Sequence, residues 1–201
     1  MAYGNLSTGA TAVGIRVEKG VVLAAEKRVS YGGYIMSRAG KKVYKITDRM
    51  AMAAAGLFAD MQTLRRIVET EIRYQEMLTS TRMSVKAAAK LLSAILYSYK
   101  YFPFLSEILF GGIDEDGSHL FVLDPVGSVI EDDYAAIGTG APIAIGIIES
   151  GYRRDMGVDG AKELAVKAIK AAISRDVMSG DGVDLAIVTS EGVCEERIPL
   201  A

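Results

Sequence analysis

The amino-acid sequence predicts an α+β fold in which two layers of helices enclose two packed, mainly antiparallel β-sheets. The first observation is the order of the elements: strands come first, then two helices, more strands, two more helices and a late strand. The second is that strands and helices do not alternate, which argues against a parallel sheet. The third is size, because 201 residues that are 50% hydrophobic suffice for one domain with a full core.

The N-terminal part of the chain has the residue pattern of β-strands. Residues 11–27 indicate two strands around a tight turn at Lys19 and Gly20, which together form a β-hairpin. A run of small apolar residues then leads to Gly56, and it is typical of a buried strand. Three strands are expected after the hairpin, at residues 34–37, 42–46 and 50–55.

Helical periodicity follows directly after these strands. Apolar residues recur at the spacing of one helix face from Met61 to Ile72, and a polar bend at residues 79–82 ends this helix. A second helix is expected from about Ser84, a favourable N-cap residue, and it must stop before Pro103. Two later helices are expected at residues 142–150 and 158–174.

The remaining strands lie on both sides of the later helices. Residues 107–113 and 119–124 are expected to pair, because the turn between them ends in Asp116-Gly117, a favourable hairpin step. A further strand is expected at residues 128–131, before a glycine turn at residues 138–140. The strand at residues 183–189 is expected to close the sheet.

The composition argues against several classes of function. The formal net charge is −2, from 23 basic and 25 acidic residues spread along the chain, so no nucleic-acid partner is expected. No apolar run is long enough to span a bilayer, so we expect a cytoplasmic protein with no membrane partner. The single Cys194 and the single His119 leave no cluster for a metal, and no metal or organic cofactor is expected. We expect His119 to have a packing or sheet-edge role.

Six blocks of residues, in order along nearly the whole chain, resemble the β subunits of archaeal 20S proteasomes. The first is Gly9-Ala10-Thr11-Ala12-Val13-Gly14, followed by residues 21–28, and it is similar to the start of the mature β subunit with its preceding glycine. The other blocks are residues 40–43, 54–56, 111–114, 138–140 and 175–180.

This resemblance implies the four-layer αββα sandwich of the N-terminal nucleophile hydrolases and the chemistry of a threonine peptidase. In this family a mature N-terminal threonine supplies the hydroxyl nucleophile, and its own α-amine, helped by a lysine, manages the proton. Self-cleavage of the preceding residues exposes that amine. By the resemblance, residues 1–9 are a short propeptide and residues 10–201 are a single β-type domain.

The resemblance assigns catalytic roles to the residues that match the family's site. Glu26 matches the acidic residue that holds the lysine, and Lys42 is that lysine, which favours deprotonation of the hydroxyl. Asp176 and Ser179 match the pair that orients the α-amine. Thr139 stands where the family usually has a serine.

Three further positions are implied to bind substrate. Gly56 would offer a backbone N–H group to the oxyanion, and the backbone at Ser30 would hold the substrate as an added strand. Ala54 lies where the family lines its specificity pocket.

The nucleophile itself is missing, because Ala10 occupies its position. Val13 and Gly14 set this register, and a methyl group cannot attack a carbonyl. Without the hydroxyl, self-processing should also fail, so residues 1–9 should be retained. Thr11 is an alternative nucleophile in a slipped register, but a shift by one residue turns its side chain to the opposite face of the strand.

The expected partners are proteasome α subunits, other β subunits in seven-membered rings, and unfolded polypeptide substrates in the complex. Two explanations for Ala10 stay open: a naturally non-catalytic subunit, or an active peptidase whose threonine was replaced by engineering. Ala12 and Thr139, which also depart from the family pattern, favour the natural explanation. A free-standing N-terminal nucleophile amidase is an alternative of another class, and it too would need a nucleophile at this position.

Overall fold

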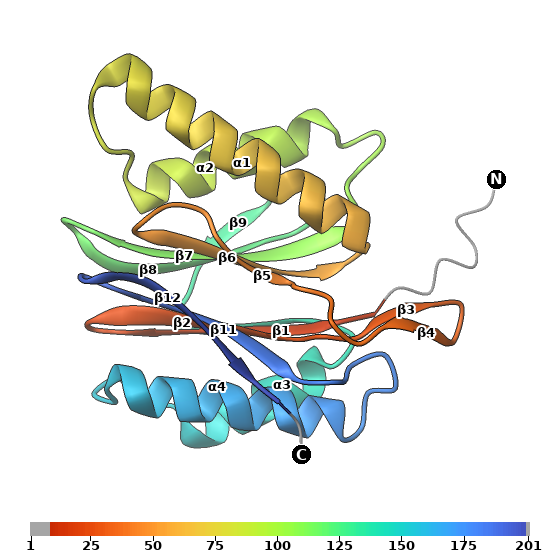
Figure 1. The fold of residues 1–201 in the computed structure, drawn as a ribbon. Helices are drawn as coiled ribbons and strands as arrows, with labels where there is room; N and C mark the ends of the chain where they lie inside the picture. Colours follow the sequence, from red (N-terminus) through yellow and green to blue (C-terminus); the bar gives the residue numbers. More distant parts are fainter. Residues whose placement is uncertain (1–8, 200–201) are drawn as a thin grey trace.

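The computed structural model describes residues 9–199, which form four layers in the order helix, sheet, sheet, helix (Figure 1). All pairings within the sheets are antiparallel. The expected α+β sandwich is therefore confirmed. Of the predicted leader at residues 1–9, all but Gly9 lies outside the described residues.

The first sheet has five strands in the order β10-β1-β2-β11-β12. Its N-terminal hairpin is the one expected from the sequence, with Ala12 opposite Ala25 and Val17 opposite Gly20. The strands are β1 (Thr11–Val17), β2 (Gly20–Glu26), β10 (Tyr134–Gly138), β11 (Val183–Thr189) and β12 (Gly192–Ile198).

The second sheet also has five strands, and they follow the order of the sequence. These are β5 (Val43–Lys45), β6 (Met50–Gly56), β7 (Ser106–Asp114), β8 (Gly117–Leu123) and β9 (Val129–Glu131). A separate two-stranded ribbon, β3 (Val29–Tyr31) with β4 (Tyr34–Ser37), extends beside the start of β1 (Figure 1).

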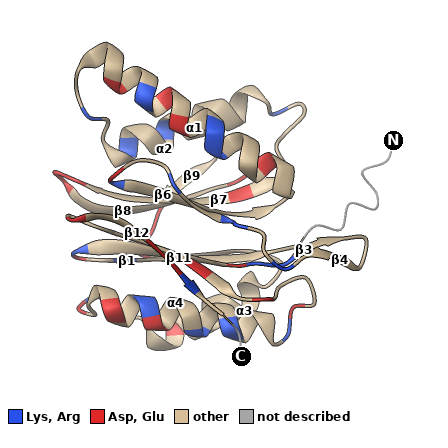
Figure 2. Ribbon diagram, in the orientation of Figure 1, with Lys and Arg blue, Asp and Glu red and all other residues tan. Residues whose placement is uncertain are grey.

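Each sheet carries two helices on its outer face (Figure 1). The helices α1 (Phe58–Thr79) and α2 (Val85–Ser98) cover the second sheet, and α3 (Ala141–Gly151) and α4 (Val158–Ile173) cover the first. The predicted N-cap of α2 is confirmed, since the Ser84 hydroxyl accepts a hydrogen bond from the N–H of Ala87 at 3.2 Å. Figure 2 shows basic and acidic residues mixed along α1 and α4.

Two apolar clusters form the core. The larger cluster fills the space between the sheets and under α1 and α2, and includes the fully buried Leu23, Met52 and Leu64. The smaller cluster joins the first sheet to α3 and α4, where Ile15 and Ile169 are fully buried. Burying each such side chain contributes about 1.5–3 kcal/mol to folding. Among the described residues, no helix has the length and apolar character needed to cross a membrane.

Sequence reasoning missed three strands: β3, β10 and β12. The strand β12 carries Glu195 and Glu196 on an exposed sheet edge, so it lacks the apolar alternation that identifies a strand. Short β3 and alanine-rich β10 also give weak patterns. The strand β10 pairs with β1, which is distant in sequence, and local sequence does not report that pairing. The strands β3 and β12 pair with their neighbours in sequence, β4 and β11.

Candidate functional site

A buried ion pair between Lys42 and Glu26 forms one half of the candidate site. Glu26 is the last residue of β2 and Lys42 directly precedes β5, so the pair joins the two sheets, and their side chains are 0% and 2% exposed. The Lys42 ammonium donates to the Glu26 carboxylate and to the carbonyl oxygen of Arg28, the latter at 2.5 Å. The Glu26 carboxylate also accepts hydrogen bonds from the N–H groups of Arg28 at 2.7 Å and Gly180 at 3.0 Å.

Burial shifts the pKa values of both groups toward the neutral forms. Loss of solvation raises the pKa of the Glu26 carboxyl, while Lys42 and the two backbone N–H groups act to lower it. Burial likewise lowers the pKa of Lys42, against the attraction of Glu26 and Asp176. A lowered pKa leaves a larger fraction of a lysine in the neutral amine form near neutral pH, and only that form can accept a proton as a general base.

A second polar cluster is built by the segment that follows α4. The Asp176 carboxylate accepts hydrogen bonds from the hydroxyl groups of Thr139 and Ser179, both at 2.6 Å. The Ser179 hydroxyl in turn lies 2.7 Å from the Thr11 hydroxyl. The structure therefore brings together Asp176 and Ser179, the pair that the resemblance assigned to α-amine orientation, and places Thr139 beside them.

Residues 10 and 11 face opposite sides of their strand. The carbonyl oxygen of Ala10 accepts a hydrogen bond from the N–H of Thr139 at 2.8 Å, and its methyl group belongs to the larger apolar cluster. Thr11 is 0% exposed, and its hydroxyl points instead to Ser179. The Thr11 hydroxyl is thus turned away from the face that carries the side chain of residue 10.

A cavity of about 220 Å³ lies in front of this site. Gly9, Ser30, Lys42 and Gly56 all line it, so three of the predicted site residues share one cavity with the residue that precedes Ala10. Gly56 has a φ of +132°, and a Cβ atom there would lie 2.1 Å from the carbonyl oxygen of Leu105. The backbone at this position therefore requires glycine.

Ala54 is placed differently from the other predicted binding residues. It is fully buried in β6, and its N–H donates to the carbonyl oxygen of Lys42 at 3.0 Å. Ala54 is not among the described residues that line this cavity or the larger cavity next to it. This backbone hydrogen bond continues the pairing of β6 with the segment that carries Lys42.

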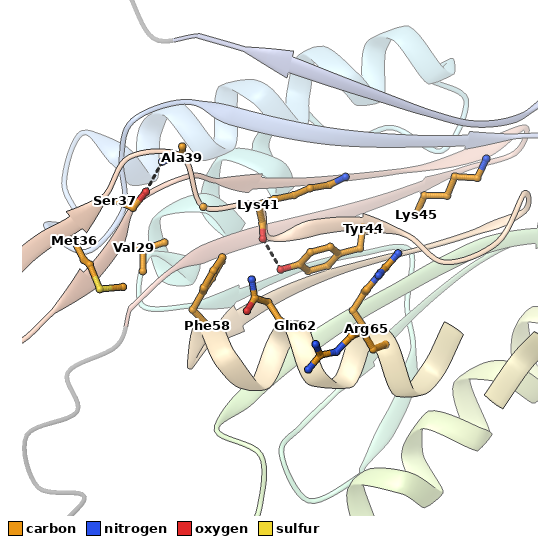
Figure 3. Close-up of a pocket in the computed structure, with 12 residues that line it drawn as sticks. Val29, Met36, Ser37, Ala39, Lys41, Tyr44, Lys45, Phe58, Gln62 and Arg65 are labelled. Atoms are coloured by element: carbon orange, nitrogen blue, oxygen red, sulfur yellow. Dashed lines mark hydrogen bonds between the residues drawn. The ribbon is translucent and has the colours of Figure 1, made fainter. Parts of the chain in front are cut away.

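A larger cavity of about 660 Å³ adjoins the first, and sequence reasoning missed it (Figure 3). It lies between the segment that leads into β5 and the first turns of α1, and residues from both line it. Its position depends on the packing of α1 over the second sheet, which no local motif reveals. The residues that line both cavities are Val29, Met36, Phe58 and Gln62.

Sequence reasoning also missed Arg28, which holds the segment after α4 against the end of β2. Its guanidinium donates to the Asp181 carboxylate at 2.9 Å and to the carbonyl oxygen of Val177 at 2.8 Å. A Cβ atom on Gly180 would lie 2.2 Å from the guanidinium, so the two groups are in close contact. Arg28 thereby sets the position of the segment that carries Asp176 and Ser179.

Within residues 9–199, no group of three or more His, Cys, Asp or Glu side chains is arranged to hold a metal ion. His119 lies in β8, where its Nδ1 atom is 2.7 Å from the Glu131 carboxylate on the neighbouring β9. Cys194 is a free, exposed thiol on β12.

The comparisons with known proteins match the same family over nearly the whole chain. The family model described as "Proteasome subunit" matches residues 6–188. Proteasome subunit beta 1 of Hyperthermus butylicus is 63% identical over 192 residues, which cover 95% of this chain and 94% of that protein. Proteasome subunit beta 2 of Thermofilum pendens is 56% identical over 191 residues, with 95% and 94% covered. Proteasome subunit beta 2 of Pyrobaculum arsenaticum is 55% identical over 190 residues, with 94% of each chain covered.

Proposed function

Because this chain belongs to the proteasome subunit family, we propose that it is a β-type subunit of the 20S core particle that cuts no peptide bond itself. The similarity to subunits named beta, at 53–63% identity, supports the β type. In this proposal the chain builds the inner rings with other β subunits, stacks on α subunits, and encloses unfolded polypeptide.

The observation that carries the proposal is the methyl group at position 10. Residues that match the family's proton-handling positions lie in contact: Glu26 with Lys42, and Asp176 with Ser179 and with Thr139, which replaces the family's usual serine. What is missing is an oxygen that could bond to a carbonyl carbon. Loss of the nucleophile from a catalytic group of this kind lowers the rate by about 10⁴ to 10⁶.

Exposed apolar side chains at the ends of α1 and α2 support an assembled state. Tyr101 and Phe102, just after α2, are 83% and 85% exposed, and Met77 near the end of α1 is 79% exposed. Met77 lies at the opposite end of this antiparallel helix pair from Tyr101 and Phe102, so the larger exposed apolar group is Tyr101 with Phe102, which a soluble monomer seldom leaves in water. Contact with other subunits would bury them.

Assembly tests the β-subunit proposal directly. Co-expression with α subunits should give a particle of several hundred kilodaltons that contains this chain, measured by light scattering after size-exclusion chromatography. A free-standing amidase would stay at the size of one or a few chains under the same conditions. Recovery of this chain only as a monomer beside its α subunits would refute the proposal.

Restoring the missing hydroxyl tests the lack of catalysis. In Ala10→Thr, the hydroxyl can attack the Gly9 carbonyl carbon, the bond from Gly9 to residue 10 breaks as the acyl group moves to oxygen, and water then hydrolyses the ester. Gly9 gains a carboxylate and residue 10 gains a free amine. Intact-mass measurement on assembled particles should show loss of residues 1–9 in Ala10→Thr.

The control is Ala10→Val, because valine has the shape of threonine without the hydroxyl. Both this variant and the unaltered chain should keep residues 1–9.

Covalent labelling of the unaltered chain by an epoxyketone at its own N-terminal residue would contradict a non-catalytic subunit. Sequencing the genomic codon for residue 10 separates natural from engineered loss, since a threonine codon would mean that the native protein is a peptidase.

A further inference from the structure

Glu195 joins an edge strand of one sheet to an edge strand of the other. It lies on β12, which ends the first sheet, and it contacts β5, which ends the second, together with the residues that lead into β5. The Glu195 carboxylate accepts a hydrogen bond from the N–H group of Lys45 at 3.0 Å and another from the Lys41 ammonium at 2.8 Å. These two contacts lie on either side of Lys42 in the chain.

The Glu195 carboxylate is ionised at neutral pH, as an acceptor of two hydrogen bonds should be. Burial raises its pKa, but the hydrogen bonds from Lys41 and Lys45 outweigh this effect, so the net pKa lies below the ordinary value of 4.5. The Lys41 side chain is half exposed, and an exposed ion pair holds its partners only weakly. The N–H group of Lys45 belongs to the backbone, so it is the contact through which Glu195 can fix the chain.

The backbone around Lys42 is held from three directions. From β6, the N–H group of Ala54 donates to the carbonyl oxygen of Lys42 at 3.0 Å. The Tyr44 hydroxyl donates to the carbonyl oxygen of Lys41, as the dashed line in Figure 3 marks. Within residues 9–199, β6 is the only strand that pairs with β5, and an edge strand leaves N–H groups without a strand partner. Glu195 supplies an acceptor for one of these groups.

The position of this backbone determines where the Lys42 ammonium lies. Lys42 is 2% exposed, and its ammonium donates to the Glu26 carboxylate and to the carbonyl oxygen of Arg28. Hydrogen bonds weaken steeply as their geometry departs from the optimum, so a small movement of the segment would disturb both contacts. We propose that Glu195, by accepting the hydrogen bond from Lys45, is a positioning residue for Lys42. This goes beyond the proposed function, because it concerns the geometry of Lys42 and not assembly or cleavage.

Two substitutions of Glu195 in the full chain test this role by nuclear magnetic resonance. Glu195→Ala removes the acceptor, whereas Glu195→Gln keeps an oxygen for the Lys45 N–H group and removes only the charge. In Glu195→Ala, hydrogen exchange of the Ala54 N–H group, which reports on its bond to Lys42, should be about five- to tenfold faster. A looser segment admits water, so the pKa of Lys42, followed at its Cε signal, should rise toward the ordinary value of 10.5. Glu195→Gln should stay close to the unaltered chain in both measurements.

The direction of the Lys42 shift separates positioning from charge, because loss of a nearby negative charge alone would lower the pKa of Lys42. The matched control is Glu196→Ala. Glu196 is the next residue of β12 and is equally exposed, at 35% against 37% for Glu195, but it pairs with Lys162 of α4. This variant should change neither measurement. Lys41→Met, which leaves the backbone hydrogen bond to Glu195 in place, should also change neither.

Three outcomes would overturn the proposal. The first is a Lys42 pKa that stays the same or falls in Glu195→Ala, and the second is an equal rise in Glu196→Ala. The third is an equal disturbance in Glu195→Gln and Glu195→Ala, which would mean that the charge and not the hydrogen bond acts on Lys42. These measurements use neither α subunits nor peptide cleavage, so their failure and a failure of the assembly experiment can be told apart.

Discussion

Replacement of Lys42 by methionine should be strongly destabilising, because it leaves the Glu26 carboxylate buried without a counter-ion. Both side chains are at most 2% exposed, so water cannot replace the lost partner. Removing one member of a buried ion pair typically costs about 3–5 kcal/mol. Glu26 keeps its hydrogen bonds from the N–H groups of Arg28 and Gly180, so we expect the low end, about 3 kcal/mol. For a domain of this size this lowers the Tm by about 6–12 °C.

The cost should depend on pH in a direction set by Glu26. In Lys42→Met the main group that lowers the pKa of Glu26 is gone, so the folded-state pKa rises further above its ordinary value of 4.5. A raised folded-state pKa stabilises the fold below the ordinary value, and that stabilisation is lost as the pH rises through the folded-state pKa. Lys42→Met should therefore be closest in stability to the unaltered chain below pH 4.5 and should become progressively less stable as the pH rises above that value.

Urea denaturation followed by circular dichroism at several pH values measures this cost. The matched control is Lys41→Met, which removes the neighbouring lysine and its exposed ion pair with Glu195. That pair is worth at most about 1 kcal/mol, with little pH dependence in this range. If Lys42→Met were no more destabilising than Lys41→Met, or if its cost did not change with pH, the electrostatic reasoning for this pair would be wrong.

Three further outcomes follow from single positions. Gly56→Ala should lower the free energy of unfolding by about 2–3 kcal/mol, because residue 56 has a positive φ and lies close to the Leu105 carbonyl. Gly146→Ala in α3, where a Cβ atom meets nothing within 4 Å, should not lower it. Equal effects of the two variants in thermal melts would count against backbone strain at residue 56. Ser84→Ala should cost about 1 kcal/mol through loss of the α2 N-cap, and an unchanged Tm would show that the cap contributes nothing. In an ultraviolet absorbance titration of the ten tyrosines, Tyr44 should ionise at about pH 12. The variant Tyr44→Phe should remove that late step, and an unchanged titration above about pH 11 in this variant would refute the assignment.

The fold was predictable where local patterns were strong. The N-terminal hairpin, the four helices and the Asp116-Gly117 turn all follow from periodicity and turn chemistry, and the structure has them at nearly the expected positions. The charged edge strand β12 and the three-residue β3 were missed because neither shows enough apolar alternation to identify a strand, although each pairs across a two-residue turn with its neighbour in sequence. The strand β10 was missed because its partner, β1, is distant in sequence.

The candidate site, like the fold, could be predicted from the sequence only in part. The candidate residues were found from blocks that resemble a family, and the structure brings Glu26 to Lys42 and Asp176 to Ser179 and Thr139. Their catalytic roles remain predictions. Arg28 and the residues of the larger cavity were not found, because each by itself is an ordinary surface or core residue.

The sequence alone determined the order of the layers and the identity of residue 10, because periodicity and a missing hydroxyl can both be read from a one-dimensional chain. Only the tertiary structure decided that the Thr11 hydroxyl contacts Ser179, what Arg28 holds, and that α1 brings Arg65 to the larger cavity. The physical reason is that these properties depend on the packing of elements far apart in the chain. Burial, which shifts the pKa values of Lys42 and Glu26, exists only after that packing.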